Sequence, residues 1–200
     1  MSTFNRRDFS IAAATLATGI SASAAAQDPG KPTPDDAERL HRETLDRARV
    51  FTKGQPAATE AGLHGLVEQL VERNLISRED AAVLHDLIKE LHAAKESVDE
   101  IVQAINRAIE RKAGELTSTI VRIARGSLKW AQEKIKNISP RKLRYVIAHD
   151  VSGALQGAAA GATVGALVAA VGAPAGAIVG AIIGSSATSL IAADDFEDKK

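Results

Sequence analysis

The side chains best suited to metal binding or proton transfer in this chain are its histidines, because the chain contains no cysteine. The histidines are His41, His64, His85, His92 and His149. On one helix, His85 and His92 would lie about 10 Å apart along the axis, at 1.5 Å per residue. One zinc ion cannot easily bind both rings at that distance, and no His-Glu-x-x-His sequence occurs. We therefore expect no metal site.

A possible catalytic serine lies in Ser139-Pro140-Arg141-Lys142, which has the Ser-x-x-Lys spacing of penicillin-binding enzymes. The partner motifs of those enzymes are absent, and Ser-Pro is also a typical start of a helix. Neither a Gly-x-Gly-x-x-Gly loop nor a Walker loop occurs, and the acidic tail 194–200 lacks the spacing of a calcium loop. We predict no catalytic residue, no cofactor and no small-molecule substrate, so the protein is not expected to be an enzyme.

Residues 1–26 have the features of an export signal. Arg6-Arg7-Asp8-Phe9 precedes a weakly apolar, Ala-rich stretch, and Ala24 and Ala26 supply small residues at a cleavage site before Gln27. This segment resembles twin-arginine signal peptides, although Ser10 and Ile11 replace the usual Leu-Lys after the Phe. A Sec signal that happens to carry Arg-Arg is the alternative. Either route places the mature protein in the periplasm, in the cell envelope or outside the cell.

The mature chain is predicted to be all-helical. Hydrophobic residues make up 45% of the sequence but aromatic residues only 3%, which favours helices over aromatic-rich strands. A Pro-rich linker, 27–34, precedes an amphipathic helical domain, 35–150. Apolar residues three or four positions apart predict helices from Pro34 to about residue 53, from Thr59 to about residue 74, and from Ser77 onward. The next stripe, 98–138, either splits or bends at Gly114 and Gly126, and a further helix begins at Pro140.

The formal net charge of zero conceals a strong division of charge along the chain. Residues 59–100 contain four basic and ten acidic side chains, whereas 101–150 contain eleven basic and four acidic ones. Either the acidic helices pack against the basic ones, or the basic helices bind an anionic lipid surface. Nucleic acid is a poor candidate partner, because few aromatic side chains accompany the basic ones. The candidate lipid-surface residues are Arg122, Arg125, Lys129, Lys134, Lys136, Arg141, Lys142 and Arg144.

Residues 151–193 carry no formal charge, and glycine recurs there at every fourth position in two sets. The sets are Gly153, Gly157, Gly161 and Gly165, then Gly172, Gly176, Gly180 and Gly184. Glycines at this spacing share one helix face, where a second backbone can approach closely. We predict two helices of roughly 20 residues, about 30 Å long, that form a hairpin with the reversal near Pro174.

This segment resembles the glycine zippers of two-helix membrane-associated domains in bacterial envelope proteins, bacteriocins and pore-forming toxins. The resemblance covers 151–193 and implies a membrane-interacting protein, either an envelope component or a bacteriocin-like permeabilising effector. It also implies membrane lipid as a partner and allows a homo-oligomer through the zipper. The alternative is a soluble periplasmic helical binding module whose Gly/Ala hairpin is simply its packed core.

Overall fold

The computed structural model describes residues 33–47, 58–94, 97–135, 137–167 and 173–194, and these all lie in the compact unit Pro32–Lys200. The described residues form seven helices and no strand, which confirms the predicted all-α class. The helices are α2 (Pro34–Arg47), α3 (Glu60–Glu72), α4 (Arg78–Ala93), α5 (Val98–Glu110), α6 (Glu115–Lys134), α7 (Pro140–Leu167) and α8 (Ala173–Asp194).

Several predicted features lie outside the described residues. They are the export signal with Arg6, Arg7, Phe9, Ala24 and Ala26, the linker up to residue 32, Lys136, Gly172 and residues 195–200 of the tail.

Side-chain caps fix the beginnings of α3 and α4. The Thr59 hydroxyl accepts a hydrogen bond from the Gly62 amide (3.2 Å), and the Ser77 hydroxyl accepts one from the Asp80 amide (3.0 Å). The Asp80 carboxylate in turn accepts from the Ser77 amide (3.4 Å), which completes a capping box. Asn74, at a φ of 55°, lies in the short connection between the two helices. The helices pack together, as the short connection predicts.

The long apolar stripe from 98 to 138 is divided at Gly114 and not at Gly126. Gly114 is the N-cap of α6, and its amide donates to Asp80 Oδ1 (2.6 Å). A Cβ atom on Gly114 would lie 2.8 Å from Asp80 Oδ2, so a side chain there would displace this contact. Gly126 is buried in the interior of α6. The carboxylate of Asp80 on α4 thus holds the point where the chain turns from α5 into α6.

Helices α7 and α8 differ from the predicted hairpin in where each of them begins. α7 has 28 residues and crosses the expected domain boundary at 150/151 without a break, since no proline follows Pro140 within the helix. α8 has 22 residues and begins at Ala173, so Pro174 lies in its first turn and not in the reversal. Proline is tolerated there because the first amides of a helix have no intrahelical acceptor.

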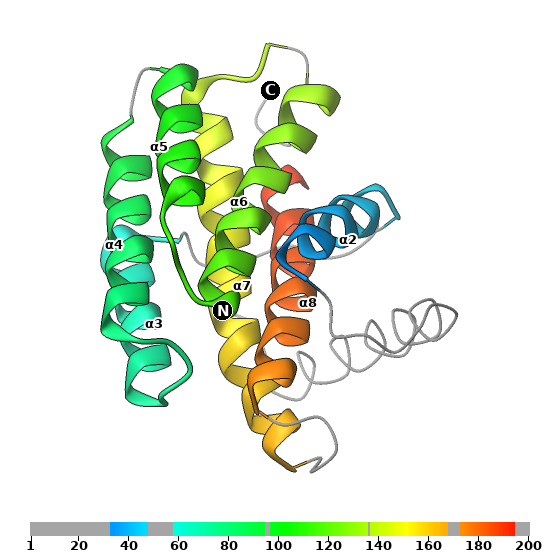
Figure 1. Ribbon diagram of the computed structural model, residues 1–200. Helices are drawn as coiled ribbons and strands as arrows, with labels where there is room; N and C mark the ends of the chain where they lie inside the picture. The colour runs from blue at the N-terminus through cyan, green and yellow to red at the C-terminus, as the bar shows by residue number, and fades with distance from the viewer. Residues whose placement is uncertain (1–32, 48–57, 95–96, 136, 168–172, 195–200) are drawn as a thin grey trace, which may run out of the picture. The chain divides into compact units, whose positions relative to one another are not determined.

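Helices α6 and α7 pack as a hairpin, and α8 packs along α7 (Figure 1). α3 packs on α4 and α7, whereas α2 packs on α6 and α8. The core is formed by branched aliphatic side chains from α3 to α8, and alanines make up a larger share of it in α7 and α8. The largest fully buried side chains are Leu63, Leu70, Leu84, Leu87, Ile88, Leu91, Ile101, Ile105, Ile120, Ile123 and Leu143.

Candidate functional site

Glycines bring the backbones of α7 and α8 into direct contact. A Cβ atom on Gly157 would come within 3.0 Å of the Gly180 carbonyl oxygen, and one on Gly180 would come equally close to the Gly157 carbonyl oxygen. A Cβ atom on Gly161 would lie 2.8 Å from Gly180 Cα, and one on Gly184 would lie 2.8 Å from Gly157 Cα. The obstructing atoms are backbone, so a side-chain rotation cannot relieve these contacts.

The same interface includes two more of the predicted glycines. The Gly153 carbonyl group faces Gly184, and the Gly176 carbonyl group faces Gly161. Gly165 also lies in α7, in the last part of that helix, where the structure does not describe the burial of individual residues. The glycine faces therefore meet within one chain.

The glycine interface is continuous with the hydrophobic core. Small and branched apolar side chains flank it and are buried with the cores of the other helices: Ala154, Leu155, Ala158, Ala162, Ala177, Ile178, Ala181 and Ile182. Ser185 is also fully buried, and its hydroxyl donates to the Ile182 carbonyl oxygen (2.9 Å). On the outer side of α8, Val179 is 40% exposed. The α7–α8 hairpin therefore shares one hydrophobic core with helices α3 to α6.

The basic side chains in the middle of α6 form ion pairs with α2. Arg122 lies 3.2 Å from Asp35, while Lys129 and Arg125 both approach Glu38, at 2.5 and 4.0 Å. The Glu38 side chain is only 13% exposed. These three predicted lipid-surface residues are therefore paired with, and partly covered by, an acidic helix of the same chain. The thin apolar stripe of α2 gives little indication of this contact in the sequence.

Arg107 of α5 and Arg111, which directly follows α5, form ion pairs with α4 instead. Arg107 binds Glu90 (2.9 Å), and Arg111 binds Asp86 (2.5 Å). Residues 59–100 thus supply the acidic partners of Arg107 and Arg111, as one of the two alternatives expects. The acidic partners of Arg122, Arg125 and Lys129 come from α2 instead. Exposed pairs of this kind contribute little to stability, about 0–1 kcal/mol each. They do reduce the positive charge that these helices present to a partner.

A second group of predicted residues lies where α6 ends and α7 begins. We call Lys134, Arg141, Lys142 and Arg144 the basic corner. Arg141 is exposed, and Arg144 donates to the His92 carbonyl oxygen (3.3 Å). The Ser139 hydroxyl accepts from the Lys142 amide (3.2 Å), which is a helix-capping contact and accounts for the Ser-x-x-Lys spacing.

The charge around the basic corner is one-sided along the chain. No acidic residue occurs from 134 to 149. Glu133, just before it, accepts hydrogen bonds of 2.7 and 2.6 Å from Arg42 on α2. Asp150, just after it, is fully buried. Along the sequence, positive charge therefore predominates around the α6–α7 connection.

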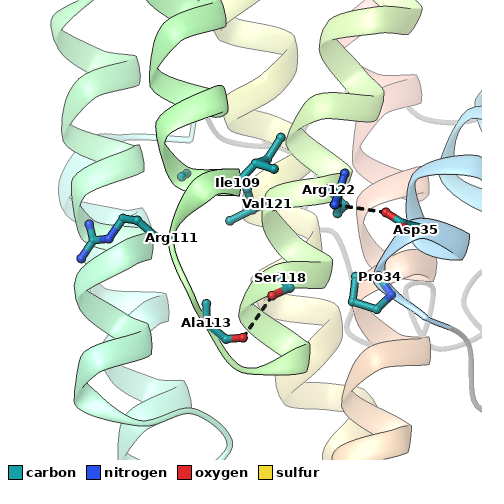
Figure 2. A pocket seen from close by; sticks show the side chains of 9 residues that line it. Pro34, Asp35, Ile109, Arg111, Ala113, Ser118, Val121 and Arg122 are labelled. Atoms are coloured by element: carbon teal, nitrogen blue, oxygen red, sulfur yellow. Dashed lines mark hydrogen bonds and ion pairs between the residues drawn. The ribbon is translucent and has the colours of Figure 1, made fainter.

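A cavity of about 200 Å³ lies between α2, α5 and α6 (Figure 2). Its walls include Ile109 and Val121, and the Arg122–Asp35 ion pair lies beside it. Figure 2 shows the Arg111 side chain turned towards α4, and the Ser118 hydroxyl donates to the Ala113 carbonyl oxygen (3.3 Å). No residue lining the cavity pairs a nucleophile with a base.

Two histidines that are distant in sequence meet between α3 and α4. His64 Nδ1 lies 2.6 Å from His85 Nδ1, and His85 Nε2 lies 2.9 Å from Glu68 Oε1. The spacing of histidines along a single helix does not indicate this pair. Residues 64 and 85 are equally distant from the connection at 74–75, so antiparallel packing of the two predicted helices places them opposite each other. Among the described residues, no group of three or more His, Asp or Glu side chains could hold a metal ion.

None of the helices in the described part of the chain is long and apolar enough to cross a membrane. Comparison with known proteins found no matching family model, no matching curated protein and no matching solved structure. The fold and its charge distribution define an all-α protein with a glycine-packed helix pair in its core and a basic corner at its surface.

Proposed function

We propose that this is an exported, non-enzymatic protein that docks on an anionic membrane surface through the basic corner. In this proposal the Gly/Ala hairpin stays packed in the helical core during docking. The protein would act as an envelope component that binds lipid headgroups. The observation that carries the proposal is the run of basic residues at the α6–α7 connection, where no acidic residue occurs from 134 to 149.

Electrostatics explains why this end of the molecule is favoured over the rest of α5 and α6. A basic residue near an anionic surface contributes about 1 kcal/mol, and salt screens this attraction. Arg122, Arg125 and Lys129 are already paired with Asp35 and Glu38. Docking through those residues would require α2 to move away.

The packing of the hairpin supports docking at the surface over insertion. Ala158, Ala177 and Ala181 are buried in the same core as the leucines of α3 and α4. Insertion of α7 and α8 would expose that core to water, which is unfavourable at about 25 cal/mol per Å² of apolar surface. The bacteriocin-like alternative requires this rearrangement. In the other alternative, a helical binding module, the basic corner binds an acidic protein.

Vesicle co-sedimentation tests the proposal. The protein is mixed with vesicles of phosphatidylcholine alone or with 30% phosphatidylglycerol, over a range of salt concentrations. We expect binding to the anionic vesicles only, decreasing steeply as salt increases. Replacing Lys134, Arg141 and Lys142 together with Gln should weaken binding about 100-fold, since three residues contribute about 3 kcal/mol.

The matched control replaces Arg107, Arg111 and Lys112 of the α5 region with Gln, which removes the same formal charge elsewhere. This control should bind nearly as well as the parent. An equal loss of vesicle affinity in the two triple variants would show that only net charge matters. It would contradict a specific role for the basic corner. Equal binding to neutral and anionic vesicles would refute the electrostatic mechanism.

A fluorescent probe on α8 separates docking from insertion. The chain has no cysteine, so Val179→Cys provides a single labelling site on an exposed position of α8. With an environment-sensitive dye at this residue, surface docking leaves the emission near its value in buffer. A large blue shift of the emission on anionic vesicles, absent on neutral ones, would instead support the bacteriocin-like alternative, in which the hairpin inserts into the membrane.

Export is tested independently of lipid binding. N-terminal sequencing of the exported protein should begin at Gln27 or within two residues of it. Replacing both Arg6 and Arg7 with Lys should block export by the twin-arginine route. Unchanged export of this variant would indicate a Sec signal, and a protein found only in the cytoplasm with its N-terminus intact would contradict export.

A further inference from the structure

His64 and His85 form a solvent-accessible pair in which two ring nitrogens point at one another. The Nδ1 atoms are 2.6 Å apart, and the side chains are 33% and 28% exposed. The ring centroids lie 4.8 Å apart, so the rings approach through their Nδ1 edges without stacking face to face. Two imidazole nitrogens can face each other at this distance only when one carries a proton and the other accepts it.

The outer nitrogens of both rings face carboxylates of α3. His85 Nε2 lies 2.9 Å from Glu68 Oε1, and His64 Nε2 lies 3.8 Å from Glu60 Oε1. Because a carboxylate accepts, His85 carries its proton on Nε2 and presents the lone pair of Nδ1 to His64. The shared proton then belongs to His64 Nδ1.

We propose that His64 and His85 bind one divalent transition-metal ion of the zinc type between their Nδ1 atoms. Metal-ligating histidines typically donate their other ring N–H to a carboxylate, and both rings of this pair face one. On binding, His64 changes tautomer, so its proton leaves Nδ1 and is taken up on Nε2 towards Glu60. The ion takes the place of the shared proton, and water molecules complete its coordination.

The geometry needs only a small adjustment to accept the ion. Zinc–nitrogen bonds of 2.0–2.1 Å in a tetrahedral site place two ligand nitrogens roughly 3.3 Å apart. The rings must therefore separate by somewhat less than about 1 Å, which rotation of half-exposed side chains can provide. With two protein ligands the site binds more weakly than a four-ligand structural zinc site. Its effect on the fold is to connect α3 to α4.

Glu68 is a positioning residue in this site. Its carboxylate fixes the tautomer and orientation of His85 without binding the ion. Loss of such an outer-shell carboxylate typically weakens metal binding 10- to 100-fold. His92 differs from the proposed ligands, because its Nδ1 is directed at the Ile88 carbonyl oxygen at 2.9 Å and so carries the proton. It provides a matched control on the same helix.

Titration calorimetry with zinc chloride tests the site in the full-length chain. We expect one zinc ion per chain, with binding weakened at least 10-fold by either His64→Gln or His85→Gln, and weakened further by the double variant. Glu68→Gln should weaken binding about 10-fold. His92→Gln should bind as the parent does. Zinc should also raise the melting temperature of the parent and of His92→Gln, and a chelator should reverse this effect.

Electron paramagnetic resonance of the copper(II)-loaded chain identifies the ligands. Hyperfine splitting should show two imidazole nitrogens in the parent and in Glu68→Gln, but one in His64→Gln. If Glu68→Gln loses a nitrogen, this residue acts as more than a positioning residue and the assignment is wrong. Parental affinity in both His64→Gln and His85→Gln, or an equal loss in His92→Gln, would overturn the proposal.

Discussion

The α3–α4 and α7–α8 pairs pack in opposite ways. The packed helices α3 and α4 bury branched side chains such as Leu70, Leu84 and Leu87. Between α7 and α8, carbonyl groups and Cα atoms of glycines meet directly. A side-chain interface can adjust its rotamers when one residue changes, whereas a backbone interface can only separate. Two helix pairs in one compact unit should therefore tolerate substitutions very differently.

The largest difference is expected from large residues in the glycine interface. Gly161→Leu and Gly180→Leu should each destabilise the protein by about 4 kcal/mol or more, above the usual range for overpacking, because the obstruction is backbone. Urea unfolding measures this. Thr163→Leu is the control, since Thr163 is exposed and loses a 3.1 Å hydrogen bond to Ala159 in its own helix and a 3.5 Å contact from Arg73. Parental stability in both glycine variants would show that the glycines are not contact points.

Removing a side chain should harm α3–α4 somewhat less. Leu87 is 1% exposed, so Leu87→Ala should leave a cavity and destabilise by about 3 kcal/mol. Leu87→Met keeps nearly the same volume, and we expect a loss below about 1.5 kcal/mol. Both values come from the same unfolding experiment. If Leu87→Met is as harmful as Leu87→Ala, the side-chain interface is as intolerant as the glycine interface, and the contrast fails.

A smaller effect is expected at the connection between α3 and α4. Ser77→Ala removes the hydroxyl that accepts from the Asp80 amide and should destabilise by about 1 kcal/mol. Ser77→Asp retains an acceptor and should remain close to the parent. Thermal unfolding distinguishes the two variants. Equal stability of Ser77→Ala and the parent would mean that tertiary packing alone positions α4.

The smallest expected effect has the opposite sign. A Cβ atom on Gly65 in α3 would meet nothing within 4 Å, so Gly65→Ala should stabilise by about 0.5–1 kcal/mol through helix propensity. The same substitution at Gly161 should destabilise, because its Cβ atom would meet backbone. Calorimetric melting of the two variants provides the comparison. Stabilisation by both would show that α7 and α8 separate easily enough to accept a methyl group.

Much of the helical framework follows from local sequence. The apolar spacing in α3 and α4, and the side-chain caps Thr59 and Ser77, place those helices within a few residues of their observed bounds. The fourfold glycine spacing predicts a close approach of two backbones, and glycines of both sets do line the α7–α8 contact. These features are local, because a helix face and a cap depend on residues within one or two turns.

Other features depended on contacts between distant segments. The periodicity alone left Gly114 and Gly126 equivalent, and the Asp80 carboxylate decided between them. The acidic residues of α2 are separated from the basic residues of α6 by some ninety positions, so charge counting along the chain could not pair them. His64 and His85 met only because α3 and α4 pack antiparallel. Sequence by itself determined which residues share a helix face, and tertiary packing decided which faces meet, because that choice minimises exposed apolar surface over the whole chain.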